Sequence, residues 1–119
     1  SMREDAATQS LINTMVTTFN TQLSSGLGSN PSVLYVDAYT VSRDEIANPV
    51  QYGLTNVSSP ACDISKLLTG NSLVCTTATL VPGVVDKYLF ADNSGHMTPY
   101  GYELLAKTVL SEMTKKGWL

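Results

Sequence analysis

The order of apolar and polar side chains predicts a long amphipathic helix near the start of the chain. Between Asp5 and Leu27, apolar positions repeat every three or four residues, which is the period of one helix face. That face consists of Ile12, Met15, Val16, Phe19 and Leu23. Gly26 and Gly28 favour an end to the helix at this point.

A second long helix is predicted to begin at Pro99. Thr98 can cap it, and Lys115 and Lys116 followed by Gly117 favour its end, since cations and then glycine suit a helix carboxyl terminus. The predicted apolar face consists of Tyr102, Leu105, Ala106, Val109, Leu110 and Met113. The chain is therefore predicted to end in an amphipathic helix.

Two short apolar runs, Val33–Val36 and Tyr88–Ala91, have the composition of buried β-strands. Between them, residues 41–47 predict a short helix that Asn48-Pro49 ends, and most of the rest up to Asp86 is predicted loop. This alternation is typical of an α/β fold with a parallel sheet. Two parallel strands with flanking helices make a very small sheet, so we expect further strands from elsewhere, either more of the same protein or an identical chain.

Length and composition limit the class of protein. A chain of 119 residues allows one domain at most, and 27 serines and threonines with only 14% charged residues are common outside the cytosol. The net charge of −3 and the scattered bases argue against nucleic acid as a partner. No apolar run approaches the roughly 20 residues that span a bilayer. The composition therefore favours a protein that acts outside the cytosol.

Two pairs of residues suggest how the chain was produced and in which kind of compartment it is located. Ser1-Met2 resembles an expression scar, because a serine before a methionine suggests a cleaved tag. Cys62 and Cys75 lie thirteen positions apart in a polar loop and predict a disulfide, which would persist only in an oxidising compartment. The alternative is two free thiols.

His96, the only histidine, lies in the loop after the second predicted strand and before the last helix. Open α/β sheets place their ligand crevice at this position. Asp92 could orient the imidazole, as in a Ser-His-Asp arrangement. The alternatives are a surface histidine and an Asx turn at Asp92. With Asp86 the pair could also ligate a metal ion, but known sites have more oxygen, histidine or cysteine ligands.

The segment from Tyr88 to Ala106 resembles the last sequence block of the GDSL (SGNH-hydrolase) lipases and esterases. In that block an apolar strand leads to Asp-x-x-His-Pro-Thr and then to a helix with a glycine and a Leu-Leu-Ala-like stretch. Upstream segments are similar to the lecithinase, haemolysin and autotransporter-esterase branch, so that the resemblance covers residues 14–116. These segments are Phe19-Asn20, Val33–Asp37, Asn48-Pro49, Tyr52–Asn56 and Pro60–Cys62.

The resemblance implies a three-layer α/β/α, flavodoxin-like fold, with residues 3–119 as the carboxyl-terminal portion of the catalytic domain. It implies hydrolysis of carboxylic esters, including lipid esters, without a cofactor or metal. His96 would be the general base and Asp92 its orienting acid. Four positions separate Asp92 from His96 where the family has three, and Met97 stands where the family has proline. The imidazole is therefore held either by Asp92 or by another acceptor.

The family's Gly-Asp-Ser-Leu nucleophile block and its oxyanion-hole blocks are not found in this sequence. We therefore expect the isolated chain to be close to inactive, with the serine supplied by an amino-terminal portion of the same enzyme. Two parallel strands would leave an open sheet edge, so pairing with a partner chain or a swapped second copy is also expected. Tyr100 and Tyr102 could line an acyl pocket, although one of them should be core and the other exposed. The expected location is secreted, periplasmic or at the cell surface. The alternative function is a non-catalytic secreted binding module.

Overall fold

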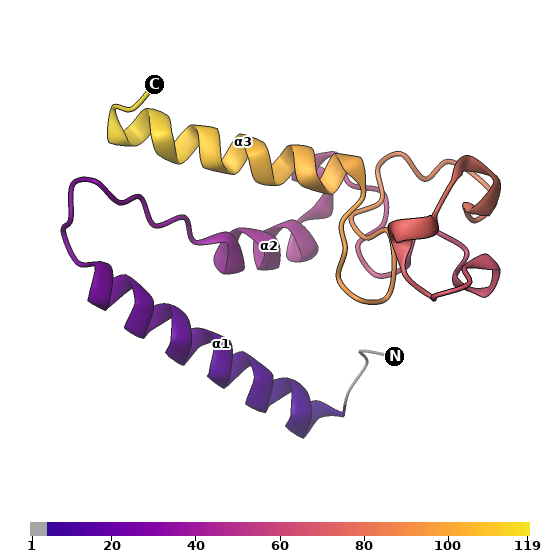
Figure 1. Ribbon diagram of the computed structural model, residues 1–119, viewed down its shortest axis with the longest axis horizontal. Coiled ribbons are helices and arrows are strands. Elements are labelled where there is room, and N and C mark those ends of the chain that lie inside the picture. The colour runs from indigo at the N-terminus through magenta and orange to yellow at the C-terminus, as the bar shows by residue number, and fades with distance from the viewer. Residues whose placement is uncertain (1–4) are drawn as a thin grey trace. The chain divides into compact units, whose positions relative to one another are not determined.

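The computed structural model describes residues 5–119 (Figure 1). Ser1 and Met2, the predicted expression scar, lie outside the described residues. The chain divides into two compact units, residues 1–36 and residues 37–119, and each is described by itself. Among residues 5–119, no helix has the length and apolar character needed to cross a bilayer.

The first unit contains helix α1, which spans Ala6–Leu27 and confirms the predicted helix. Asp5 caps its start, because the carboxylate accepts hydrogen bonds from the backbone N–H groups of Ala7 and Thr8. The helix ends at Gly28, whose φ of 55° suits glycine. No residue of α1 is buried, so the apolar side chains of the predicted face are not packed into a core.

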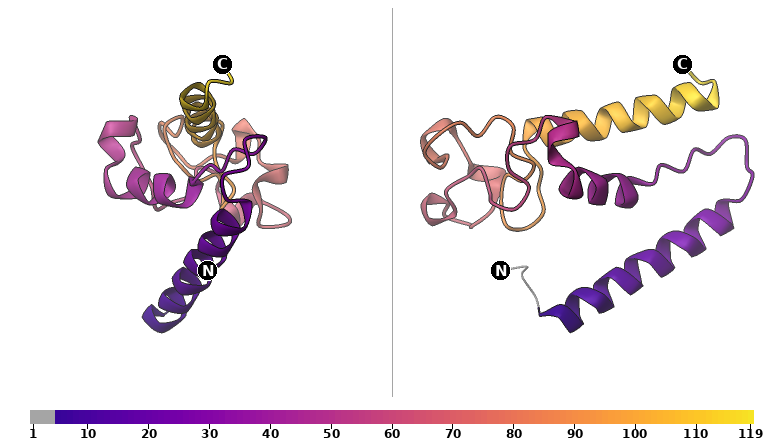
Figure 2. Two further views of the ribbon diagram at one scale, coloured as in Figure 1. Left: turned by 90° about the vertical axis from the view of Figure 1, so that its left-hand side faces the viewer. Right: turned by 180° about the vertical axis from the view of Figure 1, so that it is seen from behind.

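The second unit contains the remaining helices. Helix α2 spans Ala38–Ala47 and begins three residues earlier than predicted, because Asp37 caps it by accepting a hydrogen bond from Thr40 N–H. Helix α3 spans Pro99–Lys116, as predicted, with Thr98 as its cap. Helix α2 contacts α3, and the loop-rich part of the unit lies at the amino-terminal end of α3 (Figures 1 and 2). That part contains short 3-10 helices η1 (Pro49–Tyr52), η2 (Ile64–Lys66), η3 (Ser72–Val74) and η4 (Thr77–Thr79).

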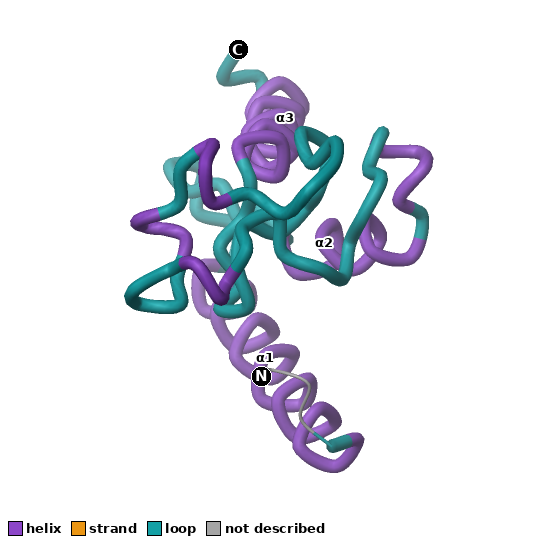
Figure 3. Tube along the Cα trace, turned by 90° about the vertical axis from the view of Figure 1, so that its right-hand side faces the viewer, coloured by secondary structure: helices purple, strands orange, loops and turns teal. Residues whose placement is uncertain are grey.

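The prediction of an α/β fold with two parallel strands is wrong for this structure. Residues 5–119 contain helices and loops but neither a strand nor a sheet (Figure 3). Residues 33–36 form no strand, and Tyr88–Ala91 forms only isolated bridges, at Tyr88 with Asn56 and at Phe90 with Met97. The composition of the two runs was strand-like, but composition does not supply a pairing partner.

The backbone N–H and C=O groups of residues 88–91 form hydrogen bonds with two loops instead of with neighbouring strands. On one side, Leu89 N–H donates to Asn56 O (2.9 Å), and Cys62 N–H donates to Ala91 O (3.0 Å). On the other side, Thr98 N–H donates to Leu89 O (3.0 Å). Each loop turns away after a few bonds, so no continuous ladder forms.

The core of the second unit is centred on Leu89, whose exposed fraction is 0%. Leu89 packs with Leu54 and with Leu104 of α3. The buried side of α3 is therefore centred on Gly101 and Leu104, whereas Tyr102 and Leu110 of the predicted face are exposed. A second cluster contains Cys62, Leu67 and Ala91. One member of this cluster, Ala91, directly precedes Asp92 in the chain.

Gly101 lets α3 approach the segment that carries Leu89. A Cβ at this position would lie 2.8 Å from the backbone oxygen of Leu89 and 2.9 Å from Cβ of Met97. Because a backbone oxygen cannot rotate away, Gly101→Ala is expected to lower the free energy of unfolding by about 1–3 kcal/mol. Urea unfolding followed by tryptophan fluorescence measures this.

Gly26→Ala is the matched control, because a Cβ at this helical position meets nothing within 4 Å. Alanine favours a helix over glycine by about 1 kcal/mol, so the control should be neutral or slightly stabilising. A Gly101→Ala variant as stable as the wild type would show that α3 does not pack this closely.

Glu45 is a buried carboxyl in α2, with an exposed fraction of 3%. Burial, with a smaller contribution from the Asp44 charge, raises the pKa of Glu45. It lines a cavity of about 340 Å³ whose other titratable groups are Tyr52, Lys107, Glu112 and Lys115. Both lysines are paired with glutamates of α3, Lys107 with Glu103 and Lys115 with Glu112.

Glu45→Gln is expected to raise the melting temperature at pH 7, because it removes a charge that folding buries. A raised folded-state pKa means that the folded state binds more protons, so wild-type stability falls as the pH rises from the ordinary glutamate pKa of 4.5. The difference between variant and wild type should therefore vanish below that pH. Calorimetry at several pH values measures it, and a pH-independent difference would contradict the assignment.

Candidate active site

A tight loop brings Asp92 and His96 together before α3 begins. Ala91 N–H donates to His96 O (2.8 Å) and closes the loop, and Phe90 bridges Met97 in antiparallel fashion. Gly95 has a φ of 90°, a conformation that favours glycine and turns the chain back. The four-residue spacing from Asp92 to His96 is therefore accommodated by the turn.

The two carboxylate oxygens of Asp92 have different partners. Oδ1 accepts from Ser94 N–H (2.8 Å) and, at 3.4 Å, from His96 N–H, which is the local Asx-type arrangement. Oδ2 lies 2.7 Å from Nδ1 of His96 and accepts from Ser72 N–H (2.6 Å). The Asx turn and the contact with the imidazole, which the sequence left as alternatives, are thus both present.

Asp92 is 2% exposed, and its environment favours the ionised form. Burial raises the pKa of the carboxyl, but the hydrogen bonds from Ser72, Ser94 and His96 together outweigh burial and hold the pKa well below its usual range. A carboxylate facing Nδ1 acts as an acceptor. It therefore favours the imidazole tautomer with the proton on Nδ1, which leaves Nε2 able to accept a proton.

The imidazole of His96 is open to an incoming group. Its side chain is 55% exposed, whereas that of Asp92 is fully buried. His96 lines a cavity of about 270 Å³ together with Asn71, Ser72, Leu73, Met97 and Tyr102. An exposed imidazole on a buried carboxylate is the arrangement that a general base requires.

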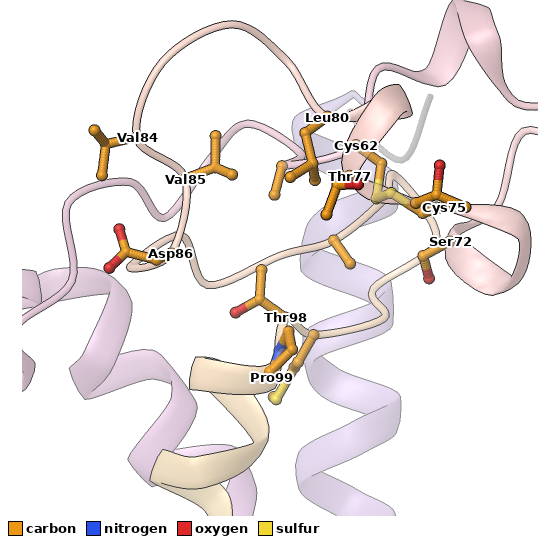
Figure 4. A pocket seen from close by; sticks show the side chains of 14 residues that line it. Cys62, Ser72, Cys75, Thr77, Leu80, Val84, Val85, Asp86, Thr98 and Pro99 are labelled. Carbon is orange, nitrogen blue, oxygen red and sulfur yellow. A yellow bond between two sulfur atoms is a disulfide. The ribbon is translucent and has the colours of Figure 1, made fainter.

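A larger cavity of about 830 Å³ adjoins this one and shares Ser72 and Met97 with it. Figure 4 shows its lining, with the Cys62–Cys75 disulfide and Leu80 on one side and Val84 and Val85 on the other. The lining is mainly apolar. A cavity of this size and character suits the apolar part of a small ligand.

Tyr100 and Tyr102 divide as the sequence predicts, one in the core and one exposed. Tyr100 packs against the Leu89 cluster and donates its hydroxyl to Tyr52 O (2.7 Å), with Lys87 Nζ 3.6 Å from the ring centroid. Tyr102 is 52% exposed and lines the His96 cavity. Tyr102 is therefore the tyrosine that could contact a ligand there.

The predicted disulfide between Cys62 and Cys75 is present. Both cysteines take part in the small apolar cluster that includes Ala91. The cross-link therefore fixes the 62–75 loop beside the residue that precedes Asp92.

Ser72 is the site residue that the sequence did not reveal. It lies 20 positions before Asp92, and no motif links the two. The one available signal was its place between the two cysteines.

Comparison with known proteins adds to this geometry. The GDSL esterase/lipase EXL6 of Arabidopsis thaliana is 27% identical over 114 residues, which cover 88% of this chain and 29% of that protein. A second GDSL esterase/lipase of the same plant is 31% identical over 104 residues, or 87% of the chain and 26% of the relative. The chain is similar to GDSL esterases and lipases. The anther-specific proline-rich protein APG of Arabidopsis thaliana is 28% identical over 83 residues, or 70% of the chain and 15% of that protein.

The chain spans less than a third of the length of these GDSL esterase/lipase relatives. No family model matches the chain, and no solved structure matches it significantly.

Proposed function

We propose that this chain is the carboxyl-terminal part of a GDSL (SGNH) serine esterase or lipase, in which His96 is the general base and Asp92 its orienting acid. The observation that carries the proposal is the 2.7 Å contact between Asp92 Oδ2 and His96 Nδ1, with the carboxylate buried and the imidazole exposed. The similarity to GDSL esterases and lipases supports the same function. The branch within the family, lecithinase/haemolysin or autotransporter esterase, is part of this proposal.

In the proposed reaction, Nε2 of His96 accepts the proton of a serine hydroxyl as the serine oxygen attacks the ester carbonyl carbon. The imidazolium, stabilised by Asp92, then gives that proton to the leaving alcohol, and an acyl-enzyme remains. In the second half of the reaction, Nε2 accepts a proton from a water molecule as the water attacks the acyl-enzyme. The proton then passes to the serine oxygen, and the carboxylic acid is released. The apolar cavity that adjoins at Ser72 and Met97 supports an ester with an acyl chain as substrate.

The serine and the oxyanion hole are proposed to come from an amino-terminal portion of the same enzyme. The disulfide supports an oxidising location, so we propose that the enzyme is secreted, periplasmic or at the cell surface. Nucleic acid has no part in the proposal.

Hydrolysis of p-nitrophenyl acetate tests the proposal. The longer enzyme should turn over, and His96→Ala should lower kcat by about 10³-fold or more. Asn93→Ala, on the same loop, is the matched control and should leave the rate unchanged. The isolated 119-residue chain should show no enzyme-like rate.

Two results would contradict this proposal. Turnover by the isolated chain that His96→Ala abolishes would place the nucleophile within these residues. Full activity of the longer His96→Ala enzyme would remove His96 from the reaction and favour the alternative, a non-catalytic binding module.

A further inference from the structure

The Asp92–His96 pair has a third member that comes from a distant part of the chain. Oδ1 of Asp92 is bound by N–H groups two and four residues further on, within its own loop. Oδ2, which faces the imidazole, is bound by Ser72 N–H at 2.6 Å, from 20 residues before it. The oxygen that contacts His96 is therefore positioned by the Ser72 segment.

The Ser72 segment is itself held in place at several points. Asn71 caps η3 by accepting from Leu73 N–H (3.1 Å), which leaves the Ser72 N–H to point at Asp92. Cys75 follows η3 directly and is cross-linked to Cys62. Cys62 N–H in turn donates to Ala91 O at 3.0 Å. The 62–75 loop is thus attached to the Asp92 segment at both of its ends.

We infer that Ser72, held by the Cys62–Cys75 disulfide, is a positioning residue for the Asp92–His96 pair. Its backbone N–H fixes Oδ2 where it can accept from Nδ1 of His96, and so sets the imidazole tautomer. The catalytic meaning of this inference rests on the proposed function. Its structural content concerns this chain alone.

The tautomer of His96 is the readout, and His96 is the only histidine, so its signals are unambiguous. Long-range proton–nitrogen NMR at a pH where the imidazole is neutral gives the fractions of the Nδ1–H and Nε2–H forms. Tyr102 is the other titratable side chain lining this cavity, so the pH is kept well below the ordinary tyrosine pKa. In the wild type, Nδ1–H should be the major form.

Ser72→Pro removes the N–H donor while fitting the local backbone. Position 72 is the first residue of η3, where proline is tolerated, and Asn71 has φ −118° and ψ 162°, which is the region that a residue before proline adopts. The Nδ1–H form should fall from the major to the minor species. Ser72→Ala separates the two donors of this residue, because it keeps the N–H and removes only the hydroxyl, whose hydrogen bond also lowers the pKa of Asp92. If the N–H positions Oδ2, Ser72→Ala should retain the wild-type tautomer.

Reduction of the wild-type disulfide should shift the tautomer in the same direction as Ser72→Pro. A dispersed amide spectrum shows that each species is folded. If Ser72→Pro loses that dispersion, Asn71→Ala takes its place, since it releases the cap of the same turn, and the same shift is expected. An unchanged tautomer in a folded Ser72→Pro or Asn71→Ala variant overturns the inference.

This result is separable from the fate of the proposed function, because the readout needs neither a nucleophile nor an ester. Loss of the tautomer shift would leave the His96→Ala hydrolysis experiment untouched. Conversely, an inactive longer enzyme would leave the positioning by Ser72 intact.

Discussion

Asp92→Asn in the longer enzyme is expected to lower kcat for ester hydrolysis by about 10⁴-fold, the loss known for the equivalent change in another Ser-His-Asp enzyme. Oδ2 of Asp92 accepts from Ser72 N–H and faces His96 Nδ1 at once. An asparagine oxygen that kept the Ser72 bond would have no charge to stabilise the imidazolium. An asparagine NH₂ at that place would donate to Nδ1, and the proton would move to Nε2, where the base is needed.

Asp37→Asn is the matched control for this substitution. It removes the same charge, but asparagine caps a helix about as well as aspartate, so α2 should keep its start and the enzyme its rate. The measurement is kcat for a short-chain p-nitrophenyl ester, with unfolding curves to show that each variant is folded. A loss of less than tenfold for Asp92→Asn would show that another group orients His96.

Leu89→Ala is expected to lower the free energy of unfolding by about 2–5 kcal/mol, the usual loss for a fully buried leucine. Leu89 is 0% exposed and joins Leu54 to Leu104 of α3. The cavity left by the substitution cannot collapse easily, because the backbone at position 89 is held on both sides. Its N–H donates to Asn56 O, and its C=O accepts from Thr98 N–H. Urea unfolding of the chain measures the loss.

Leu68→Ala is the matched control, because Leu68 is 99% exposed and its truncation should change stability by less than about 0.5 kcal/mol. Asp92 lies three residues after the core residue Leu89 and one after Ala91, so the Leu89 variant should also broaden the His96 signals. A loss below about 1 kcal/mol would contradict the core described above.

Features encoded by neighbouring residues could be predicted from the sequence. The ends of α1 and α3 depend on Asp5, Thr98 and Gly117, which act within one helical turn, and both helices were predicted nearly to the residue. The loop that carries Asp92 and His96 was predicted for the same reason, and the Cys62–Cys75 disulfide was predicted because both cysteines lie in one polar loop. Local chemistry is readable because its partners lie a few positions away.

Features that depend on distant partners could not be predicted. Residues 88–91 have the composition of a strand, but strands need continuous pairing, and two loops satisfy this segment instead. The buried side of α3 was misplaced because Gly101, which has no side chain to count as apolar, makes the closest approach to Leu89. Ser72 was missed because its contact with Asp92 spans 20 residues.

The central claim is that His96, oriented by Asp92, activates a serine that lies outside residues 5–119. Labelling with a fluorophosphonate, followed by peptide mass spectrometry, tests it most directly, because the reagent reacts with a serine that a base has activated. We predict that the longer enzyme is labelled at a serine outside these residues, that His96→Ala slows labelling by orders of magnitude, and that the isolated chain is not labelled. Labelling of a serine within residues 5–119, or labelling that His96→Ala leaves unchanged, would contradict the claim.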